Sequence, residues 1–282
     1  MRYRNKFNIN FFHNPYKKDK SLLSEKNKLE ADWYNSEADG YFAQLDTADN
    51  LIPMDKEYEE WFGAYYDKPE IKHTYDKCYN YFSSFPQTRP LKMLELGCGN
   101  GALSRFFIRR DIEVVSIDIA AKACQFLARS ESRSTPLVAC SEILPFKAGS
   151  FDIVTSYVAL HHFNLNMSLA EMYRIIKPGG AAIFMEPTVN SELFYKLRQL
   201  IPIDDNESPG GGGLVKADLI TALENTGFNF KIKEFELLTR LERLPGWHGL
   251  QRPLRKIDYT IFKALPFMKR FARVIVINMR KR

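Results

Sequence analysis

The residues best suited to bind a small polar molecule lie in the stretch LELGCGNG. Gly97, Gly99 and Gly101 alternate with other residues there, Cys98 lies between the first two, and Glu95 precedes them. A glycine-rich turn between a buried strand and a helix presents backbone N–H groups and a positive helix end to a ligand. The G-x-G-x-G spacing differs from the G-x-G-x-x-G of dinucleotide sites. Because glycines also end strands for structural reasons, the turn alone indicates a ligand site without identifying it.

A second acidic residue indicates which kind of ligand this turn binds. Asp118 ends the apolar run that begins at Val114, and Ile119 follows it. An acid at the tip of a second strand can accept hydrogen bonds from both hydroxyls of a ribose. The combination resembles the class I S-adenosylmethionine (SAM) dependent methyltransferases, whose E-x-G-x-G-x-G turn wraps the methionine part and whose second-strand acid holds the ribose. This resemblance implies SAM as the cofactor and the following binding residues: Glu95, Gly97, Cys98, Gly99, Gly101, Asp118 and Ile119.

The segment ACSEILPFKAGSFDIVTSYVALHH, residues 139–162, strengthens the resemblance. It is similar to the run DAExLPFxxxSFDxVxxxxxLHH of type-11 methyltransferases, which include the ubiquinone and menaquinone C-methyltransferases. In that family an Asp near the position of Cys140 typically contacts the adenine amino group. Here Cys140 departs from the pattern, and Ser141 is the neighbouring group that could replace it. Ser156 completes the cofactor residues that the resemblance implies.

His161 and His162 are the candidate catalytic residues. They follow an expected strand, and ligands of open α/β sheets bind at the carboxyl ends of strands. A histidine can act as a general base near pH 7. The alternative is that one of them packs under the loop and hydrogen-bonds to backbone. Glu186 ranks lower as a residue of the acceptor site, and Asp152 is expected to pair locally.

Strand and helix patterns alternate through the core, which predicts a parallel sheet with helices on both faces. The resemblance specifies a Rossmann-like, mostly parallel seven-stranded sheet whose last strand is inserted antiparallel beside the one before. Lys177–Gly180 should break the preceding helix and turn into the fifth strand. The expected strands are 91–96, 113–118, 137–140, 151–156, 181–185, 228–238 and 273–279. The expected helices are 101–110, 120–129, 169–176, 190–200 and 216–226.

Three parts of the chain are expected. Residues 1–88 form an N-terminal helical lid, residues 89–240 form the SAM-binding core, and residues 241–282 form an insertion with the final strand. Aromatic residues recur at helical spacing in the first part, beginning with Trp33 and Tyr34. Such a stripe is often only buried packing, but in the family this segment often covers the cofactor. A glycine run, Gly210–Gly213, has no Lys-Ser/Thr pair after it and is interpreted as a loop.

The composition is ordinary for a soluble globular protein. Hydrophobic residues make up 45% of the 282 residues; no apolar run reaches the ~18 residues of a membrane span, and the first residues lack a signal-peptide core. The four cysteines are scattered without a C-x-x-C pair, so neither a metal site nor disulfides are expected. A reduced, cytoplasmic location is the simplest reading.

The positive charge is concentrated at the end of the chain. Residues 251–282 hold ten Lys or Arg and one acid, although the whole chain carries only +6. Apolar residues recur at helical spacing between Leu254 and Leu265, so this segment either rests on an anionic membrane or packs on the core. The basic charge could also simply keep the protein soluble.

These features predict a SAM-dependent methyltransferase that acts on a small or amphiphilic acceptor, such as a lipid-, quinone- or secondary-metabolite-like molecule. An RNA methyltransferase is a weaker alternative, because no Asn-Pro-Pro-Tyr-like motif and no added RNA-binding module occur, so nucleic acid is disfavoured as a partner. The Cys140 departure leaves a third alternative, a SAM-binding partner protein without catalysis. The oligomeric state does not follow from the sequence.

Overall fold

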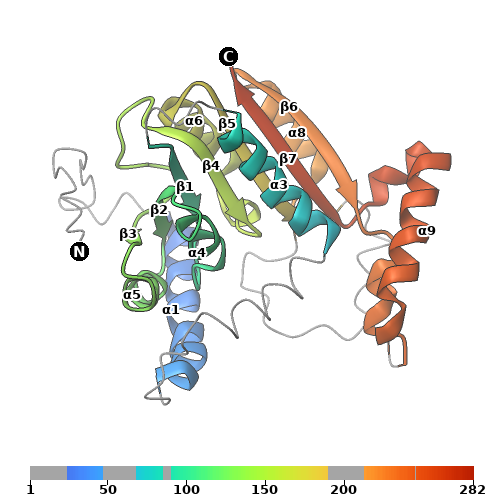
Figure 1. Cartoon of the computed structure of the whole chain (residues 1–282), viewed down its shortest axis with the longest axis horizontal. Coiled ribbons are helices and arrows are strands. Elements are labelled where there is room, and N and C mark those ends of the chain that lie inside the picture. Colours follow the sequence, from blue (N-terminus) through green and yellow to red (C-terminus); the bar gives the residue numbers. More distant parts are fainter. Residues whose placement is uncertain (1–23, 47–67, 85–89, 190–212, 245) are drawn as a thin grey trace.

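A computed structural model of the chain describes residues 24–46, 68–84, 90–189, 213–244 and 246–282 (Figure 1). The expected helix at 190–200 and most of the glycine run at 210–213 lie outside the described residues. The side chains of the aromatic stripe beyond Ser36 in the first helix also lie outside them.

Seven strands form one sheet in the order β3-β2-β1-β4-β5-β7-β6 (Figure 1). β1 to β5 run parallel, and β7 is antiparallel to both of its neighbours, β5 and β6. The predicted Rossmann-like sheet with an inserted antiparallel last strand is therefore confirmed. The strands are β1 Lys92–Leu96, β2 Glu113–Asp118, β3 Thr135–Val138, β4 Phe151–Tyr157, β5 Ile176–Pro187, β6 Phe228–Phe235 and β7 Val274–Lys281.

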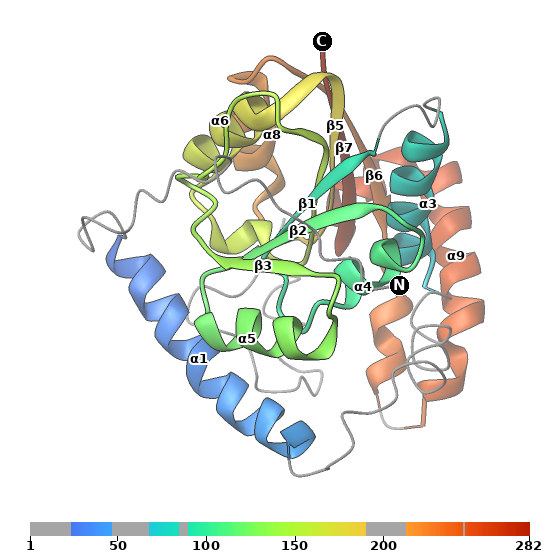
Figure 2. The same cartoon turned by 60° about the vertical axis from the view of Figure 1, so that its left-hand side comes forward.

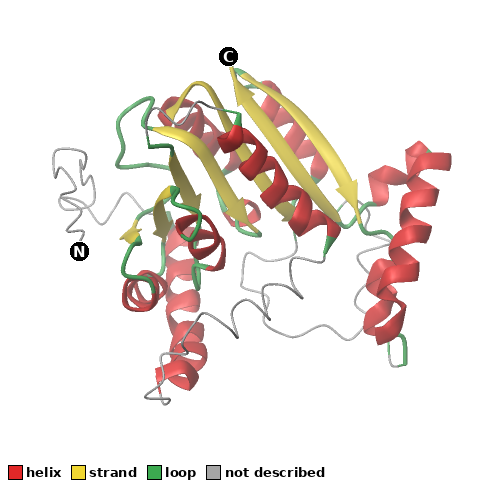
Figure 3. Ribbon diagram, in the orientation of Figure 1, coloured by secondary structure: helices red, strands yellow, loops and turns green. Residues whose placement is uncertain are grey.

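Helices cover both faces of the sheet (Figure 3). Successive residues of a strand point to opposite faces, so Met93 joins a core with α3 and α4 while Leu94 and Leu96 join a core with α6 and α8. The described α-helices are α1 Glu25–Asp46, α3 Pro69–Ser83, α4 Ala102–Ile108, α5 Ala121–Ser130, α6 Leu165–Ile175, α8 Lys216–Glu224 and α9 Gln251–Ala264. Short 3-10 helices, η4 Leu160–His162, η5 Thr239–Arg243, η6 His248–Leu250 and η7 Pro266–Phe271, connect them.

The largest difference from the predicted elements is at Lys177–Gly180. The sequence predicts a turn there, but β5 already begins at Ile176, which lies opposite Phe151 of β4. The register then shifts, so that Ala181 lies opposite Ile153 and the intervening residues bulge out of the ladder. A Cβ on Gly180 would come within 2.9 Å of the Asp152 carbonyl oxygen, so the bulge requires a glycine at this close approach.

Of the described parts of residues 1–88, α1 and α3 have different positions. α3 packs on the sheet against β5 and β7, where Ile71, Tyr75 and Cys78 are buried. α1 lies beside α5 (Figure 2). Its residues line a cavity at the carboxyl ends of the parallel strands. The lid function of residues 1–88 stays a prediction, and α1 is the described element that could perform it. No described helix is long and apolar enough to cross a membrane.

Candidate active site

A cavity of about 410 Å³ lies between α1 and the carboxyl ends of β1, β2 and β4. The strand order reverses between β1 and β4, which is where open α/β sheets bind their ligands. The volume is within the range of about 300–1,000 Å³ for small-molecule sites. Its lining includes Gly97, Gly99, Asp118, Ile119, Cys140, Ser141 and His162 among the predicted site residues, and Asn27, Glu30, Trp33, Tyr34, Glu142, Tyr157 and Phe163 from outside that set.

The three glycines of the turn have different surroundings. Gly99 has φ +48° and lines the cavity, and a Cβ built on it would meet no atom within 4 Å. A Cβ on Gly97 would approach the Ala159 Cβ to 2.7 Å, and one on Gly101 would overlap the Leu127 side chain. Gly97 and Gly101 therefore allow close packing beneath the turn, while Gly99 leaves space open in the cavity.

Asp118 links the second strand to the glycine turn. Its Oδ2 accepts a hydrogen bond from the Gly99 N–H at 2.8 Å, and its Oδ1 accepts one from the Ala120 N–H at 2.8 Å. Burial raises the pKa of this carboxyl, and the backbone hydrogen bonds oppose that rise. A carboxylate oxygen can accept more than one hydrogen bond. Asp118 can therefore hold the turn and still accept hydrogen bonds from the hydroxyls of a ligand.

Glu95 does not reach the cavity. Its side chain is buried on the α4 side of β1, where it accepts a hydrogen bond from the Ser104 hydroxyl. Burial raises the pKa of Glu95 to about 8. Its observed contacts fix α4 to the sheet behind the glycine turn. Cys98, Gly101, Ser156 and His161 likewise lie outside the lining of the cavity.

Position 140, where the family motif has an acid, is part of a small polar cluster. The Asn27 Nδ2 donates to the Cys140 Sγ at 3.3 Å and to the Glu142 Oε2 at 2.6 Å. Burial raises the pKa of the Cys140 thiol to about 12, so the thiol is protonated near neutral pH and is no nucleophile. The Ser141 hydroxyl pairs with Ser168 at 2.9 Å. The carboxylate at this end of the cavity therefore comes from Glu142, two residues after the expected position.

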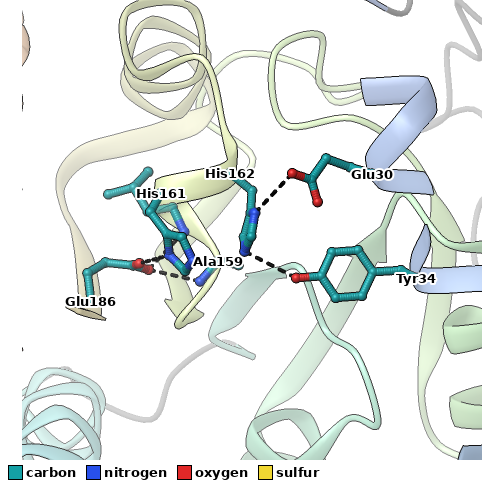
Figure 4. Close-up of polar contacts among 7 residues, drawn as sticks. Glu30, Tyr34, Ala159, His161, His162 and Glu186 are labelled. Carbon is teal, nitrogen blue, oxygen red and sulfur yellow. Dashed lines mark hydrogen bonds and ion pairs between the residues drawn. The ribbon is translucent and has the colours of Figure 1, made fainter. Parts of the chain in front are cut away.

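The two adjacent histidines have different partners (Figure 4). His161 is 7% exposed, and its Nδ1 lies 2.8 Å from the Glu186 Oε2. The other Glu186 oxygen accepts hydrogen bonds from the Ala159 and Leu160 N–H groups at 3.0 and 2.8 Å. Glu186 thus holds the turn after β4 and does not point into the cavity as the sequence suggests. Asp152 does not pair within its own strand as predicted, because its Oδ2 accepts hydrogen bonds from Lys177 of β5 and from the Lys92 N–H of β1.

His162 lies in the wall of the cavity, between two side chains of α1 (Figure 4). Its Nδ1 is 3.3 Å from the Glu30 Oε1, and its Nε2 is 3.1 Å from the Tyr34 hydroxyl. Burial, and the neighbouring His161, lower the pKa of His162, while Glu30 opposes that change. The imidazole is therefore mainly neutral near pH 7 and able to accept a proton.

Sequence reasoning missed Asn27, Glu30 and Glu142. Asn27, Glu30 and Tyr34 are three and four residues apart, a spacing that places them on one face of α1. That spacing could have indicated a polar face of the helix, but the apolar and aromatic pattern of the segment does not include Asn27 and Glu30. No cluster of three His, Cys, Asp or Glu suited to a metal ion occurs among the described residues.

Comparisons with known proteins find a matching family and relatives for part of this chain. Residues 94–184 match the family described as "Methyltransferase domain". The human mitochondrial arginine-hydroxylase NDUFAF5 is 32% identical over 128 residues, which cover 45% of this chain and 36% of that protein. The malonyl-[acyl-carrier protein] O-methyltransferase of Enterobacter lignolyticus is 27% identical over 149 residues, which cover 52% of this chain and 59% of that enzyme. The matched part spans less than two thirds of these relatives.

A solved structure extends the likeness to almost the whole fold. The geranyl diphosphate C-methyltransferase of Streptomyces coelicolor A3(2), in complex with Mg2+, geranyl diphosphate and S-adenosyl-L-homocysteine, superposes with a TM-score of 0.55. The two proteins are 18% identical, and the alignment covers 92% of this chain and 99% of that one. At this identity the likeness shows the fold alone.

The cavity fits the cofactor of such a domain. It has the size for a nucleoside with an amino-acid tail, an acid at the end of β2 to accept hydroxyl hydrogen bonds, and open space at Gly99. Together with the inserted antiparallel strand, these features identify the matched part, residues 94–184, as a methyltransferase domain of the class I SAM-dependent type.

Proposed function

We propose that this protein transfers the methyl group of SAM to a small or amphiphilic acceptor bound beside α1. SAM supplies a methyl group on a sulfonium, which makes that carbon open to attack by a nucleophile. The observation that carries the proposal is the Gly99–Asp118 pair, because its 2.8 Å bond joins the turn to the acid at the wall of one cavity. Positioning of acceptor and methyl group can supply most of the barrier reduction.

The lining of the cavity favours an acceptor with an apolar or aromatic part. Trp33 and Tyr34 of α1 line the cavity together with Tyr157 and Phe163. Aromatic walls with a few polar groups are typical of sites for small organic ligands. They support a lipid-, quinone- or secondary-metabolite-like acceptor over an RNA.

Calorimetric titration with S-adenosylhomocysteine tests the cofactor assignment. We expect one molecule to bind per chain and Asp118→Asn to weaken binding by about 1.5–3 kcal/mol, or roughly 10- to 150-fold, because a charged acceptor is lost. Asp111→Asn is the matched control, since its side chain is 95% exposed. Wild-type affinity in a folded Asp118→Asn variant would contradict the assignment.

Turnover separates an enzyme from a SAM-binding partner protein. We expect purified protein and SAM to release S-adenosylhomocysteine with at least one member of a panel of phenols, quinols, amines and acyl thioesters. Release with structured RNA alone would favour the RNA alternative. Tight binding of S-adenosylhomocysteine without turnover on any acceptor would favour the partner protein.

The segment around α9 supports a peripheral contact with an anionic membrane. Leu254 and Phe262 are buried, but large side chains on the same segment are at least 40% exposed: Trp247, Leu250, Ile257, Tyr259, Leu265 and Phe267. The exposed bases Arg252, Lys256, Lys263 and Arg270 lie among them. Apolar and basic side chains together are the composition of helices that rest on anionic bilayers.

Vesicle sedimentation tests this contact. We expect binding to phosphatidylcholine vesicles that contain phosphatidylglycerol, little binding without it, and loss of binding at high salt. Lys256→Gln with Lys263→Gln should weaken binding, while Lys72→Gln, on α3, is the control. Protein that stays in the supernatant at low salt would contradict the contact and favour an acceptor taken from solution.

A further inference from the structure

Glu30 is a buried carboxylate that is only half satisfied by the described residues. It is 4% exposed and lines the cavity. Its Oε1 lies 3.3 Å from the His162 Nδ1, whereas its Oε2 is buried without a hydrogen-bond partner in the described part of the chain. An unsatisfied buried acceptor costs about 1–3 kcal/mol, more when it is charged. A carboxylate therefore lies in the wall of the cavity at a place where burial of its second oxygen costs stability.

The partners of His162 fix the direction of its hydrogen bonds. An ionised carboxylate only accepts, so the proton of a neutral His162 is on Nδ1, next to Glu30. Nε2 then carries a lone pair and accepts a hydrogen bond from the Tyr34 hydroxyl at 3.1 Å. Tyr34 lines the cavity, and a phenol can accept a hydrogen bond while it donates one. A continuous path for a proton thus runs from the cavity through Tyr34 and His162 to Glu30 (Figure 4).

We propose that Tyr34, His162 and Glu30 form a proton relay for an acceptor that is methylated on an O–H or N–H group. The proposal rests on the proposed methyltransferase function and narrows its acceptor class. Tyr34 is the catalytic residue that meets the acceptor. Glu30 is a positioning residue, because it acts through the tautomer and charge of His162.

The proton and the bonds balance as follows. The acceptor oxygen or nitrogen exchanges its bond to hydrogen for a bond to the methyl carbon, and the electron pair of the broken carbon–sulfur bond stays on sulfur. The acceptor proton passes to the Tyr34 oxygen as the Tyr34 proton passes to the His162 Nε2. His162 becomes an imidazolium that is paired with Glu30. Since both transfers are coupled, Tyr34 gives up its own proton without remaining a phenolate.

The surroundings of His162 suit a group that stays neutral until a proton arrives. Glu30 and Tyr34 face it from α1, the His161 ring lies 3.9 Å away between ring centroids, and Glu186 of β5 lies behind His161. Burial and His161 favour the neutral imidazole, and the two carboxylates favour the imidazolium. A purely structural link between α1 and the core would need none of this balance.

Imidazole 15N NMR of the full chain tests the relay without an acceptor. His162 is assigned by its loss in His162→Asn. We expect its neutral form to carry the proton on Nδ1. Tyr34→Phe should raise the pKa of His162, because a hydrogen bond to the neutral form is lost, and Glu30→Gln should lower it, because a negative charge is lost. Tyr259→Phe is the matched control, because Tyr259 is 71% exposed, and it should change neither property.

Turnover provides the second measurement. With a phenol or amine acceptor from the panel, Tyr34→Phe should lower kcat about 10²- to 10⁴-fold while the affinity for S-adenosylhomocysteine stays within twofold of wild type. A proton on Nε2 of neutral His162, or pKa changes of equal sign in the two variants, would overturn the relay. So would methylation of carbon alone with Tyr34→Phe at full activity. If wild type fails to bind S-adenosylhomocysteine, the proposed function fails instead, whatever the NMR result.

Discussion

Replacing Glu186 should cost stability in proportion to the hydrogen bonds lost, because this residue supports the turn before the histidines. Glu186 is 0% exposed and accepts from two backbone N–H groups and from His161. Glu186→Ala leaves both N–H groups buried without an acceptor, at about 1–3 kcal/mol each. The expected loss in the free energy of unfolding is therefore about 2–6 kcal/mol for the two N–H groups together.

Glu186→Gln separates hydrogen bonding from charge. The amide oxygen can still accept from Ala159 and Leu160, and its NH2 group can donate to the Nδ1 of the other His161 tautomer. We expect a loss of about 1–1.5 kcal/mol, close to the net value of one hydrogen bond. Urea unfolding followed by circular dichroism measures both variants, and an unchanged m-value shows that the same surface unfolds.

The result that would refute this reasoning is equal stability of the Ala variant and wild type. A residue that served the acceptor alone would behave differently, because both variants would lose turnover without losing stability. The order wild type, Gln, Ala in unfolding free energy is thus the signature of a residue that holds the turn.

Gly101→Ala should be about 1–3 kcal/mol less stable in urea unfolding than Gly99→Ala, because both variants share the backbone strain but only Gly101→Ala forces a methyl group against the buried Leu127. In calorimetry the order should reverse, because Gly99→Ala should lose more affinity for S-adenosylhomocysteine. Asp258 accepts hydrogen bonds from three backbone N–H groups at residues 237–239, so Asp258→Ala should cost about 3 kcal/mol and speed amide hydrogen exchange in α9. The native pKa of Glu95 is raised from 4.5 to about 8, so native protein binds a proton that unfolded chain releases across this range, and stability falls as pH rises. Glu95→Gln lacks this titration. As pH rises from 4.5 to 8, its free energy of unfolding relative to wild type should therefore increase by on the order of 4 kcal/mol, as measured by urea unfolding at several pH values.

The parallel strands could be predicted because burial on both faces leaves a readable pattern. β1, β2 and β4 are almost wholly buried between helices. Pairs of adjacent apolar residues such as Val114–Val115 and Ile153–Val154 mark two of them, and the observed bounds of all three differ from the predicted ones by at most one residue. The bulge at Lys177–Gly180 could not be read in the same way. Its Pro-Gly-Gly is also typical of a turn, and only the pairing of Ile176 with Phe151 shows that the strand has already begun.

Only those residues of the candidate site that belong to a local sequence motif could be predicted. Gly99 is recognisable because it lies in a glycine-rich turn before a helix. Asp118 is recognisable because it ends an apolar strand. Glu30 and Tyr34 reach His162 across 132 and 128 residues of sequence, a contact that no local spacing encodes. α1 begins at Glu25, and its first turns carry no apolar pattern because the buried positions there are Asn27 and Glu30.

The polar inner side of α1 has a consequence for how the cavity is closed. α1 meets the core through hydrogen bonds from Asn27 to Glu142, from the Lys122 N–H to Asn35, and between His162 and its two α1 partners. Each such bond contributes a net of about 0.5–1.5 kcal/mol, while ordering each backbone residue costs about 1–2 kcal/mol. Among the described residues of α1, these bonds therefore contribute little beside the apolar burial that holds α3 on the sheet. A ligand that contacts both α1 and the glycine turn would add contacts between them, so we expect ligand binding to hold α1 more firmly against the core.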